Sequence, residues 1–159
     1  MHNNKRRVVV TGLGTYNPLG NNPDALWQKI STAQSGIAPI THFDASEYKT
    51  RIAGEVKAFD PVGLFGRKEA RRMSRVTQFA MAATQQALDH ANLFSNGLQR
   101  DDVGVIIGCG MGSMEPLVDA TNMLNERGPN RVSPFFVPMM LIDTPAATIA
   151  IAHVFRGPK

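Results

Sequence analysis

Three consecutive valines closed by two glycines decide the fold of this chain: Arg6-Arg7-Val8-Val9-Val10-Thr11-Gly12-Leu13-Gly14. Adjacent β-branched residues favour a short strand that is buried on both faces, and Gly12 and Gly14 end it. A second apolar run over 102–108 predicts another buried strand, which leads into the glycine-rich loop 108–112. Two such strands, far apart in sequence, predict a central sheet that is at least partly parallel.

Helical patterns separate and follow these strands. The residues at 21–24 offer a helix cap with proline in the first turn, and the apolar spacing behind them ends at Ser35-Gly36. The segment 67–91 lacks glycine and proline and repeats apolar residues every three or four positions, so it predicts one long helix. Strands that alternate with helices predict an α/β layered fold.

The remaining segments are less regular. Residues 37–60 predict a loop with one short strand around 51–56. A helix is predicted at about 114–126 and a last one over 141–154 despite Pro145, whereas the prolines at 129, 134 and 138 exclude regular helix across 127–138.

Composition narrows the class of protein. The 159 residues are 43% hydrophobic and 19% charged, which excludes a disordered tail, and the formal net charge of +4 favours an acidic partner. Cys109 is the single cysteine, so an intramolecular disulfide framework and a cysteine zinc cluster are excluded. The valine run is too short for a signal or membrane-spanning segment, and we expect a soluble, cytoplasmic protein.

Positive charge gathers at the start of the predicted long helix. Arg67, Arg71 and Arg75 follow one another at four-residue spacing, which predicts a single helix face, and Lys68 and Arg72 flank them. A solvated helix face and a binding surface for an acidic protein or a phosphate-bearing ligand are both open interpretations. Nucleic acid is disfavoured, because no aromatic residue interleaves with these cations.

The loop 108–112 and its cysteine each have an ordinary and a functional interpretation. The loop lacks the third glycine of a dinucleotide site and the Lys-Ser/Thr pair of a P-loop, so it predicts close backbone packing. Cys109 is either a nucleophile or a small buried apolar residue. The second interpretation is favoured, because no spacing marks any of the four histidines as its base: His2, His42, His90 and His153.

Large apolar residues surround the prolines of the last third. Core filling is the usual role of such residues, and a pocket for a long apolar chain is the alternative, because methionine adapts to variable shapes. The residues concerned are Met111, Met114, Phe135, Phe136, Met139 and Met140.

The order of several motifs resembles the β-ketoacyl-acyl carrier protein synthases, most closely the synthase II group of fatty acid synthesis. The matching blocks cover essentially the whole chain: 6–14, 34–37, 42–44, 67–69, 107–112, 133–138 and 156–158. The resemblance implies a thiolase-like layered α/β/α fold, of which residues 1–159 would form an incomplete amino-terminal domain. It also implies a homodimer without metal or organic cofactor. From the residues themselves we expect a cytoplasmic protein with no membrane and no nucleic acid as partner.

The same resemblance implies an activity and a set of site residues. The family joins an acyl chain, held as a thioester on a cysteine, to malonyl-carrier protein with release of carbon dioxide. By position, Met111 and Phe136 correspond to the acyl pocket, the latter reaching across the dimer. Four cations correspond to the surface that docks the acidic acyl carrier protein in its acyl and malonyl forms: Lys68, Arg71, Arg72 and Arg131.

The resemblance places no catalytic residue within 1–159. The family's nucleophilic cysteine follows the turn at 156–158, beyond Lys159, and its histidines and lysine lie in the other half, so we expect this chain alone to be inactive. Cys109 stands where relatives commonly have serine, and Asp143 where they often have asparagine. Three alternatives remain: a non-catalytic carrier-binding or split-subunit half, a polyketide synthase relative, and an independent enzyme that uses Cys109.

Overall fold

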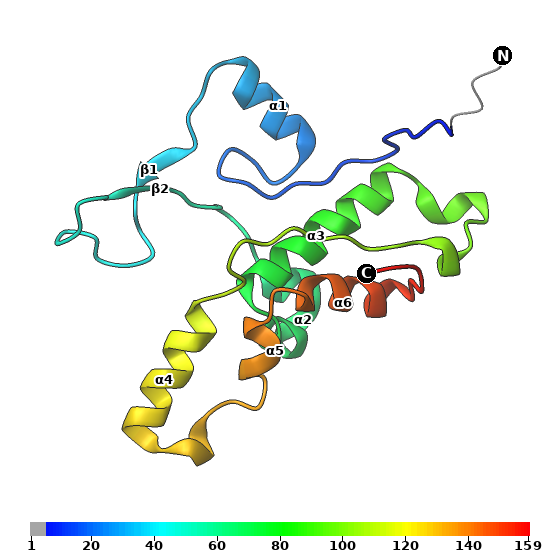
Figure 1. Cartoon of the computed structure of the whole chain (residues 1–159). Coiled ribbons are helices and arrows are strands. Elements are labelled where there is room, and N and C mark those ends of the chain that lie inside the picture. Colours follow the sequence, from blue (N-terminus) through cyan, green and yellow to red (C-terminus); the bar gives the residue numbers. More distant parts are fainter. Residues whose placement is uncertain (1–5) are drawn as a thin grey trace.

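The computed structural model of the protein describes residues 6–159, apart from the side chain of Asn96, and places helix α3 (Arg75–His90) at its centre (Figure 1). Helix α6 (Thr144–His153) packs along α3. Figure 1 shows α1 and the β1–β2 hairpin set apart from this pair, with α4 and α5 on another side. The other elements are α1 (Pro23–Ser31), β1 (Ile37–Pro39), β2 (Ile52–Gly54), α2 (Pro61–Ala70), η1 (Leu93–Asn96), η2 (Arg100–Asp102), α4 (Glu115–Arg127), η3 (Pro129–Arg131) and α5 (Phe136–Met140).

The hydrophobic core is small and lies between α3 and α6. Ile149 and Ala150 of α6 are almost fully buried, and Val105 and Phe155 complete the cluster of buried residues. Apolar side chains of α3, among them Met81 and Leu88, pack against it. The core therefore depends on one helix pair and on the two chain segments that flank it.

Elements with a clear local signal were predicted correctly. Helix α1 begins where the cap predicts, because the Asn22 side chain accepts a hydrogen bond of 2.8 Å from the Ala25 amide. Helices α4 and α6 are confirmed, and Pro145 is tolerated in the first turn of α6. Strand β2 is confirmed and pairs antiparallel with β1, whose residues were expected to lie in a loop.

The prediction of one long helix over 67–91 is wrong. Helix α2 ends at Ala70 and α3 begins at Arg75, because Ser74 has an extended backbone and acts as the N-cap of α3. The side-chain Nε2 of Gln78 donates to the carbonyl oxygens of Ala70 at 2.9 Å and Met73 at 3.2 Å. These bonds satisfy carbonyls that the end of a helix leaves free, so the break is stable.

Helix α5 corrects a second expectation. The prolines were expected to exclude helix across 127–138, but α5 begins at Phe136 and includes Pro138. Pro138 is the third residue of this helix, where the backbone N–H has no intrahelical partner. The lack of a backbone N–H on Pro138 therefore removes no hydrogen bond from the helix.

The two runs predicted as buried strands are extended but do not form paired strands within residues 6–159. Val8 and Ile106 are 92% and 91% exposed. Strands need a hydrogen-bonded neighbour, and here only residues 103–105 have the beginning of one: Gly157 N donates to Val103 O at 3.1 Å, and Val105 N donates to Pro158 O at 2.9 Å. Apolar sequence alone did not reveal which strands would be adjacent.

Gly12 and Gly14 do more than end an extended run. A Cβ atom at either position would collide with the backbone of α3, at the carbonyl oxygens of Ala87 and Ala83 respectively. The segment is also fixed by a 3.1 Å hydrogen bond from Leu13 N to Nδ1 of His90. The two glycines thus allow the amino-terminal segment to lie directly on the central helix.

We expect the protein to self-associate, because apolar side chains in its extended segments are exposed to solvent. Val8, Val10 and Ile106 are 92%, 81% and 91% exposed, and unpaired extended backbone invites pairing with another chain. Sedimentation velocity over a hundredfold range of concentration should show species larger than the monomer. A monomer at all concentrations, with a sharp and concentration-independent unfolding transition, would contradict this expectation.

One histidine makes stability depend on pH. His153 stacks on both Phe155 and Phe94, with ring centroids 5.4 and 6.3 Å away, and the two phenylalanine rings lie 6.1 Å from each other. Its Nε2 is buried without a hydrogen-bond partner among the described residues. Burial, and secondly the cation of Arg100, lower the pKa of His153 below its ordinary value of 6.5. The folded protein therefore favours the neutral imidazole.

The expected result is a loss of stability on acidification. Because the folded-state pKa is the lower one, this contribution is fully present above pH 6.5 and falls as the pH drops below that value. Urea unfolding at pH 7.5 and 5.5 measures the difference. In His153→Phe, which keeps an aromatic ring but cannot titrate, the difference should shrink; an unchanged difference would mean that other groups cause it.

Candidate functional site

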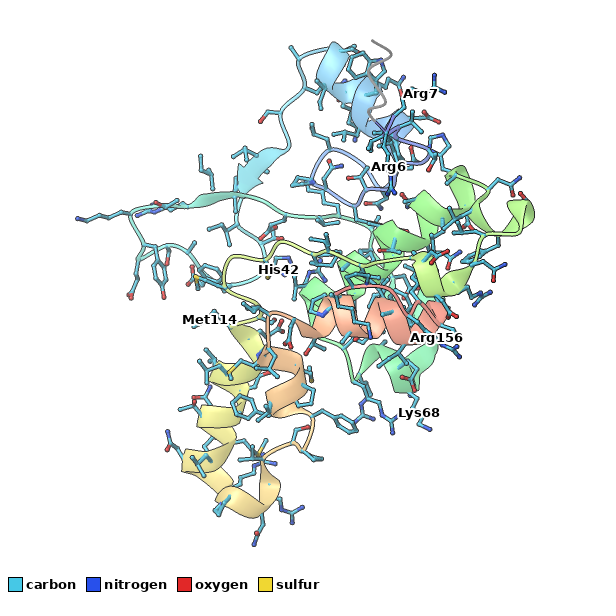
Figure 2. All side chains as sticks on the ribbon, turned by 45° about the vertical axis from the view of Figure 1, so that its right-hand side comes forward. Arg6, Arg7, His42, Lys68, Met114 and Arg156 are labelled. Carbon is cyan, nitrogen blue, oxygen red and sulfur yellow. The ribbon has the colours of Figure 1, made fainter. Side chains whose placement is uncertain are left out.

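Four cations surround a hollow at the end of α2, here called the basic hollow. It has a volume of about 420 Å³ and is lined by Arg67, Lys68, Arg71, Arg72, Ser133 and Phe135. Ser133 and Phe135 come from the segment before α5, some sixty positions further along the chain. Figure 2 shows Lys68 extending outward from the ribbon. The hollow is open to solvent and suits an anionic group.

Arg72 has the best-defined contacts in the basic hollow. Its guanidinium carbon lies 5.0 Å from the ring centroid of Phe135, within cation–π range. Its Nη1 atom lies 3.3 Å from Oε1 of Glu69. Arg72 is therefore held in place on two sides, whereas Lys68 carries its charge on a long exposed stem.

A second hollow adjoins the first. It has a volume of about 210 Å³ and lies between α4 and α5, and Arg71 lines both hollows. Arg131 of η3 and Phe136 also line the second hollow. The four residues predicted for carrier docking thus belong to two adjoining hollows, and we call this set the docking surface: Lys68, Arg71, Arg72 and Arg131.

Arg75 does not belong to the docking surface, although it continued the four-residue spacing. Its guanidinium carbon lies 4.8 Å from the ring centroid of Phe79, and its Nη2 donates to the carbonyl oxygen of Val56 at 3.3 Å. The break between α2 and α3 redirects this side chain. The single charged helix face predicted from the spacing is therefore wrong, while the grouping of Arg67 with Arg71 holds.

The two residues predicted for an acyl pocket do not line the same hollow. Phe136, at the start of the helix, lines the second hollow with Met139. Met111 is 69% exposed in the loop before α4 and is not among the residues that line that hollow. The neighbouring Gly112 has φ of +72°, and a Cβ there would lie 2.6 Å from the carbonyl oxygen of Met140, at the end of α5. The predicted close packing thus holds at Gly112 only, because a Cβ at Gly108 or Gly110 would meet no atom within 4 Å.

Cys109 has the surroundings of a structural residue. It is half-buried, and its Sγ accepts a 3.2 Å hydrogen bond from Gly112 N. His90 accepts a hydrogen bond from Leu13 at the end of α3, and His153 is stacked in the core. His2 lies outside the described residues. Within residues 6–159, no group of three or more His, Cys, Asp or Glu side chains gathers to hold a metal ion.

Sequence reasoning missed two members of the basic hollow. Ser133 and Phe135 were noted as parts of an apolar and proline-rich motif, not as neighbours of the cations on α2. The signal that could have found them is their position: both lie within four residues of Arg131, which was already assigned to the docking surface.

Comparison with known proteins decides the family. The model of the family "Beta-ketoacyl synthase, N-terminal domain" matches residues 5–159. The chain belongs to the β-ketoacyl synthase family. It is 46% identical over 155 residues to the 3-oxoacyl-(acyl-carrier-protein) synthase 2 of Synechocystis sp., and 41% identical to the enzyme of that name from Vibrio cholerae. In each case the match covers 98% of this chain and 37% of the relative, so the chain spans little more than a third of these curated relatives' length.

Solved structures establish the fold of this β-ketoacyl synthase chain as that of the thiolase-like ketosynthases. A β-ketoacyl synthase from Burkholderia phymatum superposes with a TM-score of 0.78 at 27% identity, covering 96% of this chain and 38% of that one. The ishigamide ketosynthase/chain length factor gives a TM-score of 0.85 at 24% identity, covering 97% and 39%. In residues 6–159, no helix is long and apolar enough to cross a bilayer.

Proposed function

We propose that this chain forms the amino-terminal part of an elongating β-ketoacyl-acyl carrier protein synthase and supplies its carrier-docking surface. The observation that carries the proposal is the basic hollow together with Arg131, a concentration of positive charge in a chain 46% identical to a 3-oxoacyl-(acyl-carrier-protein) synthase 2. Complementary charge steers an acidic protein to its site and fixes its orientation.

In this proposal the whole synthase joins an acyl thioester to malonyl-carrier protein. Carbon dioxide leaves the malonyl group, its carbon attacks the acyl carbonyl, and the acyl thioester bond breaks to release the thiol that held the chain. The product is a β-ketoacyl chain on the carrier protein. Residues 1–159 contribute docking and part of an acyl-binding wall at Phe136, while the nucleophile and its bases are supplied from outside these residues. The hydrogen-bond partner of Cys109 Sγ among the described residues is Gly112 N, which cannot act as a base. This supports the division, because a nucleophile needs a base within hydrogen-bond reach.

Fatty acid elongation is the favoured pathway over polyketide synthesis. The curated relatives named 3-oxoacyl-(acyl-carrier-protein) synthase 2 are 40–46% identical to this chain. A type II polyketide ketosynthase, solved in complex with its acyl-carrier protein, has a TM-score of 0.78 but only 20% identity. That complex supports a carrier protein as the kind of partner. We further propose that the whole synthase is a cytoplasmic homodimer.

The experiment that tests the proposed function captures the native protein from its source cells with an antibody against this chain. The captured material is supplied with acyl- and malonyl-carrier protein, and the products are followed by mass spectrometry. We expect a β-ketoacyl product two carbons longer than the acyl substrate, whereas purified residues 1–159 should bind carrier protein and yield none. Captured material that binds no carrier protein would overturn the proposal.

Alternative roles are separated by two simple results. Carrier binding without any condensation by the captured material would favour a non-catalytic carrier-binding subunit. Rapid stoichiometric labelling of Cys109 by iodoacetamide near neutral pH would favour an independent cysteine enzyme, whereas slow labelling agrees with its role in loop packing.

A further inference from the structure

Arg72 contacts the carboxylate of Glu69 and the ring of Phe135. These two neighbours lie differently with respect to the basic hollow. Phe135 lines the basic hollow, so it holds the guanidinium from within. Glu69 is not among the residues that line the basic hollow; it lines a separate hollow with Phe65 and Ile151. The carboxylate therefore approaches Arg72 from outside the basic hollow.

The ion pair between Arg72 and Glu69 is weak enough for an anion of a partner to displace Glu69. The side chains of Arg72 and Glu69 are 41% and 57% exposed, and they meet through a single nitrogen–oxygen contact of 3.3 Å. Exposed pairs of this geometry contribute little to stability. A guanidinium is a hydrogen-bond donor only, so the Nη1 group that Glu69 engages can donate to another anion as soon as Glu69 moves away.

Phe135 keeps the Arg72 guanidinium in place while another anion replaces Glu69. The ring lies 5.0 Å from the guanidinium carbon and does not depend on Glu69. When the carboxylate leaves, the cation remains over the ring and beside the hollow. The Arg72 side chain is therefore already fixed before the partner binds, which lowers the entropic cost of docking.

We propose that Glu69 is a built-in competitor of the acidic partner for Arg72, and that Phe135 is the positioning residue that keeps Arg72 at the basic hollow when Glu69 is displaced. This inference rests on the proposed function and adds to it a determinant of affinity. A carboxylate or phosphate of the carrier protein takes the place of Glu69 on Arg72. Glu69 thereby weakens binding and allows rapid release.

The test measures binding of fluorescently labelled bacterial holo-acyl carrier protein to the protein by anisotropy at low salt. Glu69→Gln should lower the Kd about two- to fivefold, the range of an exposed charge pair. Glu47→Gln on the exposed loop 41–50 makes the same change in net charge away from the basic hollow and should leave the Kd within error. In an Arg72→Gln background, Glu69→Gln should have no further effect, because the arginine for which it competes is absent.

Phe135 is tested separately from charge. Phe135→Leu should raise the Kd although every cation remains, and Phe135→Tyr, which restores a ring, should return it toward the original value. An equal effect of Glu69→Gln with and without Arg72 would overturn the competitor role, since the carboxylate would then act only through the general field. Equal Kd values for the leucine and tyrosine variants would overturn the positioning role. If the unaltered protein does not bind carrier protein, the proposed function fails, and this inference fails with it.

Discussion

Reversing both charges in Arg71→Glu/Arg72→Glu is expected to abolish most carrier binding, raising the Kd at low salt by about a hundredfold. Arg71 lines both adjoining hollows and Arg72 is pre-positioned over Phe135, so the double variant places two carboxylates at the centre of the docking surface. The acidic partner would then meet repulsion where it had attraction. Anisotropy with labelled holo-acyl carrier protein at 20 and 300 mM salt measures the effect, which should be smaller at high salt because screening weakens exposed charges.

A matched control separates local docking from net charge. Lys49→Glu/Lys57→Glu alters two exposed lysines near the β1–β2 hairpin. Each reversal removes two units of charge, so both double variants lower the formal net charge from +4 to 0. The control should change the Kd only slightly. Equal losses in the two variants would mean that overall charge, and not the docking surface, attracts the carrier protein.

Gly14→Ala is expected to destabilise the protein by about 3 kcal/mol, at the upper end of the cost of overpacking. The added methyl group would collide with the carbonyl oxygen of Ala83 and would lie 2.8 Å from Ala87 N. These are backbone atoms of a central helix and cannot rotate away. The amino-terminal segment must therefore lift off α3, and the 3.0 Å hydrogen bond from Thr15 N to Oε1 of Gln86 would be lost.

Urea unfolding with limited proteolysis checks this expectation. Gly14→Ala should lower the free energy of unfolding and expose the chain around Thr15 to cleavage before the α3–α6 pair is cut. Gly108→Ala is the control, because a Cβ at Gly108 meets no atom within 4 Å, and it should leave stability nearly unchanged. If Gly14→Ala and Gly108→Ala unfold at the same urea concentration, the close approach to α3 contributes nothing to stability.

The parts of the fold that local sequence determines were predictable. Asn22 followed by proline specifies the start of α1, and the apolar spacing of α4 and α6 is contained within each helix. The break after α2 escaped prediction because the apolar pattern continues across it, although Ser74 is a favoured N-cap residue and the Gln78 side chain bonds back to Ala70. An uninterrupted apolar pattern carries no sign of such a bond.

The pairing of the strands and the full lining of the site could not be predicted, because both depend on contacts between residues far apart in the sequence. Valines and isoleucines indicate extended backbone, but pairing depends on which segment lies alongside. The long-range backbone hydrogen bonds of residues 103–105 are made with 157–158. In the basic hollow, the cations of α2 were identified by charge, while Phe135 was not, because its contact with Arg72 joins segments more than sixty residues apart. The resemblance to the family supplied Arg131, which spacing could not have provided.

Because Phe135 and Phe136 are adjacent in the chain, the shape of the basic hollow and the shape of the second hollow cannot change independently. Phe135 contacts Arg72 in the basic hollow, and Phe136 lines the second hollow, so a single peptide bond joins the two walls. A backbone shift that improves one hollow reshapes the other. In evolution, a change of partner and a change in the second hollow would therefore arise together, and in protein engineering residues 131–139 form one transplantable cassette rather than two independent sites.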